Sequence, residues 1–507
     1  MSTTSNQIES AHSSSENAEL DPQSRRKRCI AGLSQFLPQE CILSTIEELK
    51  PYESDGLTLF KTVPLAVVLP NTIEQIQLIM RWASAEKIPV VARGAGTGLS
   101  GGALPHSEGI ILGLAKFSSI LELDPVNGFA RVQPGVRNLA ISDAARPHGL
   151  YYAPDPSSQI ACTIGGNVAE NSGGVHCLKY GLTVHNVLSV TVVTVDGDLL
   201  TIGSQGLDSA GYDLLALLNG SEGMLAITVE VTVKLLPVPP SAKLVMAAFE
   251  TVEDAGAAVG KVIAEGVIPA GLELMDSPAI KAAEAFAQCG YPTDAAALLL
   301  CELDGLEEEV ESQIAIVSTV FDQCHATTQY VAQDEEERLK LWKGRKSAFP
   351  AVGRLSPDYY CIDGTIPRRH LPDVLKRMDE LSTEYDLKIA NVFHAGDGNL
   401  HPLIMYDANI PGEIERTEKL GSQILQLCVE VGGTVTGEHG VGVEKINEMC
   451  VQFSEDTLTQ FHSVKAAFDP EGLLNPGKAV PTLQRCAEFG AMHVHHGELP
   501  HSDLERF

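Results

Sequence analysis

The sequence predicts an α+β fold built from two domains. Two glycine-rich clusters lie between short apolar segments in the first half, and the run PVPP at residues 237–240 ends that pattern. Beyond it, strand-length and helix-length apolar patterns alternate, which is typical of an antiparallel sheet covered by helices on one face. The 507 residues, of which 44% are hydrophobic, suffice for two cores.

The N-terminal 58 residues are predicted to form a tail and a helical segment. Residues 1–28 are rich in Ser, Glu and Asn and are predicted to be a disordered tail that ends in the basic run RRKR. That run is either a contact for an anionic partner or the solvated start of a helix. Residues 29–58 are predicted to be a helical segment, because apolar residues recur at helical spacing from Ile30 to Leu49.

The first alternation of strand and helix follows residue 59. Pro64–Leu69 is an apolar run of strand length, and Thr72 is a good N-cap for a helix that extends to Ala85. Two further apolar segments, Ile88–Ala92 and Gly109–Leu114, are predicted to be buried strands.

The stretch RGAGTGLSGG (Arg93–Gly102) connects these two strands. Its glycines permit positive φ angles and a concave row of backbone N–H groups, which suits an anion and a diphosphate above all. A mobile linker is the alternative. The stretch also contains G-x-G-x-x-G, but the dinucleotide fingerprint needs a helix directly after its glycines. Because no helix fits before Gly109, we expect a strand, a loop and a strand, and no NAD.

Two hairpins and a helix are predicted in the rest of the first half. An Asn-Gly pair separates strands at 119–124 and 129–133, and an Asp-Gly pair separates strands at 187–195 and 199–202. Residues 136–147 have helical spacing and end at a proline.

A second glycine cluster lies between those hairpins. It consists of YYAPDPSS (residues 151–158) and TIGGNVAENSGG (residues 163–174), and NGSEGMLAI (residues 219–227) follows later. Glycine pairs of this kind let the backbone approach a planar ring system, and ordinary turns are the alternative.

The second half is predicted to alternate strands and helices. The spacing of its apolar residues indicates strands at 243–249, 270–275 and 295–303 and helices at 252–265, 278–289 and 306–323.

Two histidine motifs in the second half suggest chemistry. In VFHAGDGNLHP, His394 and His401 flank a tight glycine turn, so a hairpin brings both imidazoles together. In GEHGVG, Glu438 and His439 lie between glycines. Two histidines and one carboxylate fit a divalent metal with open positions, and coincidental core histidines are the alternative. His439 is then left as a neutral imidazole that accepts a proton from a metal-polarised hydroxyl.

Arg345, in LWKGRKSAF, is a candidate clamp for a substrate carboxylate, because guanidinium binds carboxylates through two parallel hydrogen bonds. An exposed arginine on a helix is the alternative, and the sequence does not choose between them.

The net charge of −30 argues against nucleic acid or an anionic membrane as the main partner. Because a chain of this charge repels small anions, a binding site for a small anion must contain a cation of its own.

The eleven cysteines show no C-x-x-C pair, which predicts reduced thiols and argues against a disulfide framework or an iron–sulfur site.

No apolar run approaches the ~18 residues of a membrane span. The N-terminus has no secretory signal pattern, so we expect a cytoplasmic protein. The tail MHVHHGELPH (residues 492–501) is expected to pick up metal ions adventitiously.

Taken together, RGAGTGLSGG, APDPSS, TIGGNVAENSGG, GSEG, HAGDGNLHP, GEHGVG and FDPEGLLNPGK resemble the FAD-linked oxidases of the vanillyl-alcohol oxidase type. The resemblance covers roughly residues 59–478 and is greatest to the branch that contains the flavin subunits of glycolate oxidase and the D-lactate and D-2-hydroxyglutarate dehydrogenases. It implies a two-subdomain FAD-binding domain at residues 59–238, a cap domain at residues 239–480 whose C-terminal part returns to the flavin, and a tail at residues 481–507.

The resemblance also implies roles for individual residues. His394, His401 and Glu438 match the metal ligands of the family, with zinc or manganese expected, while His439 matches its general base and Arg345 its substrate-carboxylate arginine. FAD is expected to bind noncovalently, because no histidine lies in the first glycine loop. The implied FAD-contacting residues are Gly94, Ala95, Gly96, Thr97, Gly98, Ser100, Gly101, Pro154, Asp155, Thr163, Gly165, Gly166, Asn167, Asn171, Gly173, Gly174, Glu222, Gly223, Ile227 and Asn475.

The implied activity is oxidation of a small D-2-hydroxy acid, glycolate or D-lactate, to the 2-oxo acid. Electrons then pass to an external acceptor, which is a quinone, a cytochrome or an iron–sulfur partner subunit. Phe349 and Cys361 stand where 2-hydroxyglutarate enzymes hold a second carboxylate, which favours a small substrate. A D-2-hydroxyglutarate-type dehydrogenase, a noncatalytic flavin-binding subunit and a metal-dependent hydrolase are the alternatives. Peripheral membrane association and homo-oligomerisation stay open.

Overall fold

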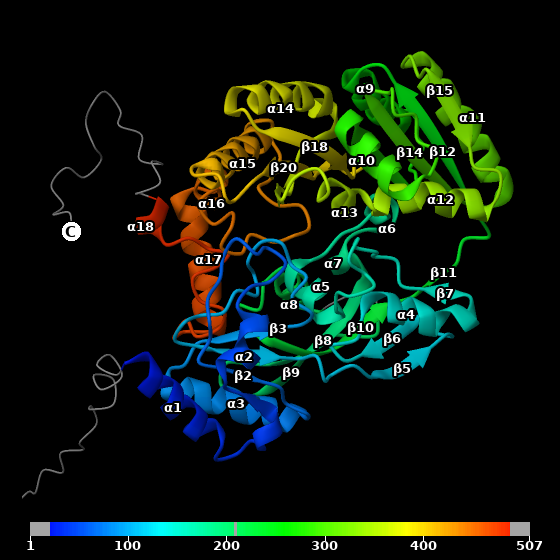
Figure 1. Cartoon of the computed structure of the whole chain (residues 1–507). Helices are drawn as coiled ribbons and strands as arrows, with labels where there is room; N and C mark the ends of the chain where they lie inside the picture. Colours follow the sequence, from blue (N-terminus) through cyan, green and yellow to red (C-terminus); the bar gives the residue numbers. More distant parts are fainter. Residues whose placement is uncertain (1–20, 207–209, 487–507) are drawn as a thin grey trace, which may run out of the picture.

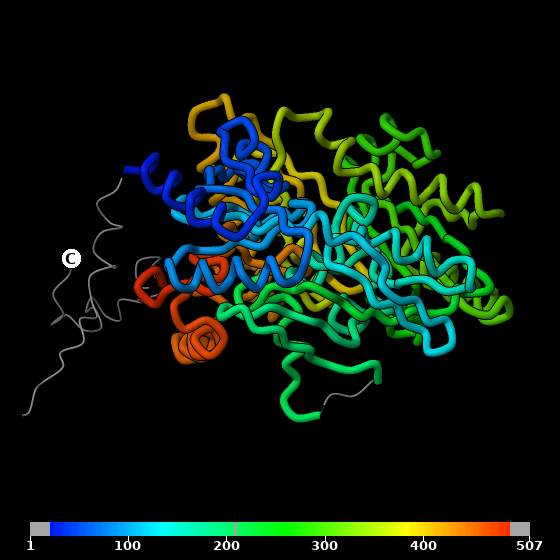
Figure 2. Tube along the Cα trace, turned by 90° about the horizontal axis from the view of Figure 1, so that it is seen from below, coloured from blue at the N-terminus to red at the C-terminus, as the bar shows by residue number. Residues whose placement is uncertain are grey.

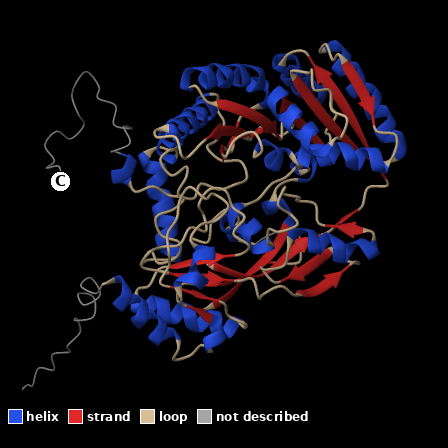
Figure 3. Ribbon diagram, viewed as in Figure 1, coloured by secondary structure: helices blue, strands red, loops and turns tan. Residues whose placement is uncertain are grey.

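The computed structural model describes residues 21–206 and 210–486. Two lobes lie one above the other, and helix α17 (Glu455–Phe468) runs along one side between them (Figure 1). The lower lobe, from α1 to the boundary at residue 238, contains a four-stranded sheet, a five-stranded sheet and the small pair of β7 with β11, and the upper lobe contains one large sheet with its helices (Figure 3). The predicted α+β organisation in two domains is confirmed.

The first sheet of the lower lobe carries the glycine loop. Its strand order is β1-β2-β4-β3, and β2, β4 and β3 run parallel. The predicted N-cap is confirmed, since the Thr72 side chain accepts a hydrogen bond from Gln75 N, 3.3 Å away. No helix lies between β3 and β4, as expected for a loop without a Rossmann helix. The elements are β1 (Ile42–Leu43), β2 (Ala66–Val68), α3 (Ile73–Glu86), β3 (Val90–Arg93) and β4 (Ile110–Gly113).

The N-terminal segment differs from the expectation in two ways. Helix α1 (Pro22–Leu33) lies partly inside the range 1–28 that was predicted as a disordered tail, and the Asp21 side chain caps it. The single helical segment expected up to Leu49 is also wrong, because β1 interrupts it and pairs with β2. A new helix, α2 (Ile46–Leu49), then starts at a capping box formed by Thr45 and Glu48.

The second sheet of the lower lobe is antiparallel, with the order β5-β6-β10-β8-β9. Both predicted hairpins, β5 with β6 and β8 with β9, are present. The elements are β5 (Ile120–Asp124), β6 (Phe129–Val132), α4 (Asn138–Ala145), β7 (Leu150–Tyr151), α5 (Ile164–Glu170), α6 (Cys177–Tyr180), α7 (Thr183–Asn186), β8 (Val187–Val193), β9 (Leu199–Gly203), α8 (Leu214–Leu218), β10 (Ile227–Lys234) and β11 (Leu236–Pro237).

The upper lobe is the cap, a seven-stranded sheet with the order β15-β12-β14-β13-β18-β20-β16. The predicted strands and helices of its first half are present. Its strands are β12 (Ser241–Phe249), β13 (Gly271–Asp276), β14 (Ala297–Gly305), β15 (Thr328–Val331), β16 (Asp358–Cys361), β18 (Lys388–Phe393) and β20 (Pro402–Tyr406). A small pair, β17 (Gly364–Thr365) and β19 (Asn399–Leu400), lies beside the sheet.

Helices cover both faces of the cap sheet, so the expectation of one covered face is wrong. Val245 and Ala247 of β12 pack into one core and Leu244 and Met246 into another, because successive side chains of a strand point to opposite faces. One face is covered by α9 (Val252–Ala264), α11 (Glu307–Gln323), α14 (Leu371–Tyr385) and α15 (Glu413–Glu430), and the other by α10 (Ser277–Ala287), α12 (Glu335–Lys346) and α13 (Ala348–Val352).

After the cap, the chain returns to the lower lobe. Seen from below, α17 lies at the same end of the molecule as the N-terminal helices (Figure 2). Beyond it, Leu474 forms a parallel bridge with Val90 of β3, and Asn475 N donates a 2.9 Å hydrogen bond to Val90 O. The C-terminal segment therefore extends the sheet that carries the glycine loop.

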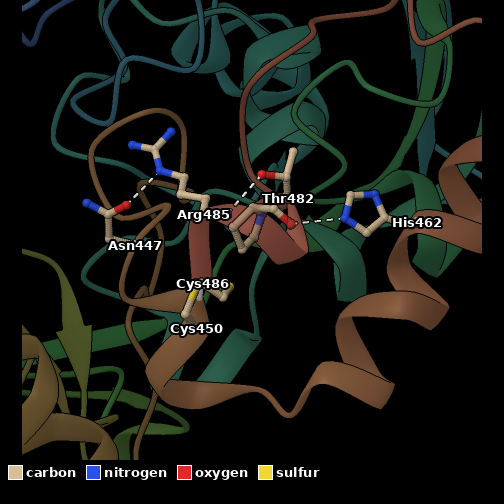
Figure 4. The surroundings of a disulfide bond; sticks show 7 residues. Asn447, Cys450, His462, Thr482, Arg485 and Cys486 are labelled. Carbon is tan, nitrogen blue, oxygen red and sulfur yellow. Dashed lines mark hydrogen bonds between the residues drawn. A yellow bond between two sulfur atoms is a disulfide. The ribbon is translucent and has the colours of Figure 1, made fainter. Parts of the chain in front are cut away.

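One pair of cysteines departs from the prediction of reduced thiols. Cys450 of α16 (Met449–Gln452) and Cys486 of α18 (Leu483–Cys486) form a disulfide (Figure 4). The other nine cysteines are free and buried. The two partners are 36 residues apart in the sequence, so no local pattern revealed the bond.

Within residues 21–206 and 210–486, no helix combines the length and the apolar character needed to cross a membrane. The histidine-rich stretch at residues 492–501 lies outside the described residues.

Candidate functional site

A cavity of about 510 Å³ lies where the two lobes meet. The lower lobe contributes both glycine clusters, and the cap contributes the ends of α12 and α13 and the two histidine motifs. The wall includes Arg93–Leu99, Pro156–Ser158, Thr163, Gly165–Asn167, Glu170, Ser221–Gly223, Lys346, Phe349, Pro350, Tyr359, His401, Glu438 and His439.

The glycine loop is folded tightly under one side of the cavity. Gly96 has φ +71°, and a Cβ atom there would lie 2.3 Å from the guanidinium of Arg93. A Cβ atom on Gly94 would lie 2.2 Å from Thr163 Oγ1, so only glycine lets the two clusters approach. The hydroxyl of Thr163 is buried and has no hydrogen-bond partner among the described residues. This concave backbone and unpaired hydroxyl fit a polar, phosphate-bearing group.

The cavity wall contains many of the predicted FAD-contacting residues. Glu222 also connects the two lobes, since its carboxylate accepts hydrogen bonds from Val441 N and Gly442 N at 2.7 and 2.8 Å. The predicted residues in the wall are Gly94, Ala95, Gly96, Thr97, Gly98, Thr163, Gly165, Gly166, Asn167, Glu222 and Gly223.

The other predicted residues of the lower lobe do not line the cavity, because each is engaged elsewhere. Ser100 and Gly101 pack against the cap loop at Val443, and Ser100 O accepts a hydrogen bond from Val443 N. Asp155 lies next to His176, 2.9 Å from its Nδ1. Ile227 is part of the hydrophobic core.

Four more of them shape the backbone instead. Asn171 has φ +51° and ends α5, and Pro154 O accepts a hydrogen bond from Asn138 Nδ2. Gly173 packs against the carboxylate of Glu438, and Gly174 packs against the carbonyl of Asp155.

Asn475 also lies outside the cavity wall. Its amide nitrogen donates to the carbonyl oxygens of Gly102, at 2.9 Å, and Glu222, at 2.6 Å. It therefore fixes the glycine loop from behind.

The two histidine motifs meet on the cap side of the cavity. His394 follows β18 and His401 precedes β20, and His394 N donates to Asn399 O across the turn, as the predicted hairpin requires. Glu438 Oε1 lies 2.9 Å from His401 Nε2 and 3.4 Å from His394 Nε2. Ligand atoms of His394, His401 and Glu438 all lie within 4.8 Å of one another. The second oxygen of Glu438 is buried without a hydrogen-bond partner among the described residues, so this donor set fits a divalent cation.

The loop that carries Glu438 and His439 is wrapped around Asp363. The Asp363 carboxylate accepts hydrogen bonds from the backbone N–H groups of Gly437, Glu438 and His439 at 2.9 to 3.2 Å. Lys445 Nζ, fully buried, lies 3.2 Å from the same carboxylate. Burial disfavours the ionised form of Asp363, but Lys445 and His439 outweigh this effect and hold the pKa of its carboxyl well below the ordinary value. Sequence reasoning missed Asp363, although a charged residue after the apolar strand YYCI was a usable signal.

The ring of His439 is unprotonated and lies against the other histidine motif. Its ring stacks on that of His401, with the centroids 4.9 Å apart. Burial lowers the pKa of His439 to about 4, so its imidazole is neutral near pH 7. Its Nδ1 has no hydrogen-bond partner among the described residues.

Arg345 is buried, not an exposed helical arginine. Arg338, Trp342 and Arg345 lie on one face of α12, and Arg345 Nη2 is 2.6 Å from Glu273 Oε2. Arg345 does not belong to the cavity wall, whereas the adjacent Lys346 does. Arg345 Nε has no hydrogen-bond acceptor among the described residues.

Comparison with known proteins agrees with this geometry. Residues 64–203 match the family described as FAD binding domain, and residues 238–479 match FAD linked oxidases, C-terminal domain. The chain is 62% identical to the glycolate oxidase subunit GlcD of Escherichia coli (strain K12), over 96% of this chain and 97% of the relative. The chain belongs to the FAD-linked oxidase family.

Other members of the FAD-linked oxidase family are also similar. The glycolate oxidase subunit GlcD of Bacillus subtilis (strain 168) is 40% identical over 84% of this chain and 91% of the relative. A D-lactate dehydrogenase of Archaeoglobus fulgidus is 34% identical over 87% of this chain and 99% of the relative.

Solved structures show the same fold for this FAD-linked oxidase. p-Cresol methylhydroxylase with substrate bound has a TM-score of 0.78 and 18% identity, and the match covers 91% of this chain and 98% of that chain. An alkyldihydroxyacetonephosphate synthase has a TM-score of 0.69 and 18% identity, over 89% of this chain and 85% of that chain. The fold implied by the sequence resemblance is therefore confirmed.

Proposed function

We propose that the chain oxidises a small 2-hydroxy acid, glycolate or D-lactate, to the corresponding 2-oxo acid. The observation that carries this proposal is the single cavity that joins the glycine clusters to the imidazole–carboxylate cluster. The names of its relatives, glycolate oxidase subunit GlcD and D-lactate dehydrogenase, support the substrate class.

The lower lobe would hold noncovalent FAD. Residues Gly94–Gly98 fit its diphosphate through their backbone N–H groups, and Thr163 offers an unpaired hydroxyl beside them. When bound, FAD supplies the acceptor for a hydride from the α-carbon of the substrate. Phe349 and Pro350 of the cap form the opposite wall and help to exclude water.

His394, His401 and Glu438 would hold a divalent cation, with zinc or manganese expected from this nitrogen and oxygen donor set. Such a cation supplies Lewis acidity toward the substrate hydroxyl. Next to these ligands, His439 is neutral and accepts the hydroxyl proton on a ring nitrogen.

The substrate carboxylate needs a cation in this acidic protein. Arg345, through its unpartnered Nε, is the proposed clamp. Lys346 lies in the cavity wall, and its contact with Asp155 is long, at 3.9 Å, so its charge adds to the clamp. Together they favour an anion near the imidazole cluster.

The electrons then leave to an external acceptor, for which we propose a quinone, a cytochrome or an iron–sulfur partner subunit. The word subunit in the names of two relatives supports a complex. We propose a cytoplasmic location, since nine of the eleven cysteines are unpaired, with the Cys450–Cys486 disulfide as the exception.

A substrate panel tests the proposal. The purified chain is mixed anaerobically with glycolate, D-lactate or D-2-hydroxyglutarate while flavin absorbance is recorded, before and after treatment with a chelator. We expect bleaching by glycolate or D-lactate that chelation slows. A colourless protein, bleaching by D-2-hydroxyglutarate alone, or bleaching indifferent to chelation would each contradict one part of the proposal.

A further inference from the structure

Glu273 is a charged residue at the centre of the cap. It lies on β13, the middle strand of the seven-stranded sheet, and only 1% of it is exposed. A buried carboxylate is costly unless it is paired and hydrogen-bonded, so its partners explain its presence.

Those partners are two residues of the proposed site. Both oxygens of Glu273 lie 2.9 to 3.0 Å from His394 Nδ1. Its Oε2 also lies 2.6 Å from Arg345 Nη2.

The contact with Glu273 decides which ring nitrogen of His394 faces Glu438. With Nδ1 donating to Glu273, the lone pair of Nε2 points toward Glu438 Oε1, 3.4 Å away. Metal-binding histidines characteristically donate their other ring N–H to a carboxylate, which orients the ring and makes it a stronger ligand. His401 lacks this support, since its Nδ1 has no hydrogen-bond partner among the described residues.

We infer that Glu273 is a positioning residue that holds the ligand His394 and the carboxylate clamp Arg345 as one unit. The inference rests on the proposed function, because it assigns His394 to a metal and Arg345 to the substrate. One carboxylate between them sets both the direction of the metal ligand and the direction of the guanidinium.

A neighbouring residue provides a matched control. Glu302 lies on the adjacent strand β14 and is also buried. It contacts a histidine and an arginine of α12, the helix that also carries Arg345. His176 Nε2 is 3.1 Å from its Oε1, and Arg338 Nη1 donates a 2.7 Å hydrogen bond to its Oε2. Glu302 therefore repeats the chemistry of Glu273 without contacting a proposed ligand.

The test compares Glu273→Gln with Glu302→Gln in the full chain with FAD bound. Affinity for Zn²⁺ and for Co²⁺ is measured by competition with a chelator, and the Co²⁺ absorption spectrum reports the coordination. Affinity for oxalate, an unreactive dicarboxylate, is measured by flavin perturbation. Glu273→Gln is expected to lose about 10- to 100-fold in metal affinity, to change the Co²⁺ spectrum and to weaken oxalate binding, with FAD content unchanged. Glu302→Gln is expected to keep the metal affinity within about twofold, even if it unfolds more easily.

Glu273→Asp keeps the charge but shortens the side chain, so an intermediate loss is expected, and it replaces the glutamine variant if that fails to fold. Equal metal affinity in wild type and either Glu273 variant would overturn the inference, as would a wild-type chain that takes up no metal. A wild type that binds metal but does not oxidise 2-hydroxy acids would refute the proposed function and leave the positioning role intact.

Discussion

Replacing Asp363 by Asn is expected to loosen the loop that carries Glu438 and His439. The carboxylate accepts three backbone hydrogen bonds from that loop and pairs with Lys445, and both charged residues are fully buried. Asparagine is nearly isosteric, but it carries no charge and places an NH₂ group among donors. Removing one partner of a buried ion pair costs about 3–5 kcal/mol.

We therefore expect the free energy of unfolding of Asp363→Asn, measured by urea titration, to fall by about 3–5 kcal/mol. Flavin reduction by glycolate should slow by at least about tenfold, because the base moves from its place. Asp304→Asn is the control, since this buried carboxylate pairs with Lys179 at the junction of the lobes, away from the loop. It should lower stability and leave flavin reduction nearly unchanged. Flavin reduction at the wild-type rate in Asp363→Asn would show that the position of His439 does not depend on this carboxylate.

Three further predictions follow from individual contacts. Burial opposes the charge of His176, but Asp155 raises the pKa of this imidazole to about 10. Because the pKa of His176 in the folded chain exceeds the ordinary value of 6.5, the stability that its charge contributes is complete below pH 6.5 and is lost as the pH rises through about 10. Urea titrations should therefore show a free energy of unfolding that falls over this pH range in the wild type and not in His176→Asn. Cys450→Ser opens a loop of 36 residues and should lower the free energy of unfolding by about 4 kcal/mol, and an unchanged midpoint under non-reducing conditions would contradict this. Lys346→Met should raise KM for glycolate about tenfold with little change in kcat, and Arg345→Met should raise KM further. A larger KM in Lys346→Met than in Arg345→Met, measured by steady-state kinetics, would show that Lys346 is the main contact of the substrate carboxylate.

Local patterns were sufficient for most of the secondary structure. The Thr72 cap, the two hairpins and the strands and helices at the start of the cap depend on residues close in sequence, and they are present. The strand β1 was missed because its two residues pair with Val67 and Val68, which are distant in sequence. The second covered face of the cap had a signal, since β14 opens with an unbroken apolar run, Ala297–Cys301, without the alternation of a sheet that has one face in water.

The candidate site shows the same division. His394 and His401 come together because a turn of few residues joins them, and Glu438 joins them from a second glycine loop. Of the partners that hold them, Glu273 lies on β13 and Asp363 lies between β16 and β17, so the spacing within the two motifs does not reveal them. The hydrogen bond from Asn475 to the glycine loop also joins segments far apart in the sequence, and its contact with the cofactor stays a prediction.

One cavity joins the flavin-binding lower lobe to the imidazole of His439, which the cap supplies and which we propose as the proton acceptor. Rapid anaerobic mixing of glycolate or D-lactate with wild type and His439→Asn, at matched FAD content, measures whether flavin reduction depends on this imidazole. We predict that the substrate bleaches the wild-type flavin and leaves the flavin of the variant oxidised, although the variant binds FAD equally well. Equal rates of bleaching in the two proteins would contradict the claim.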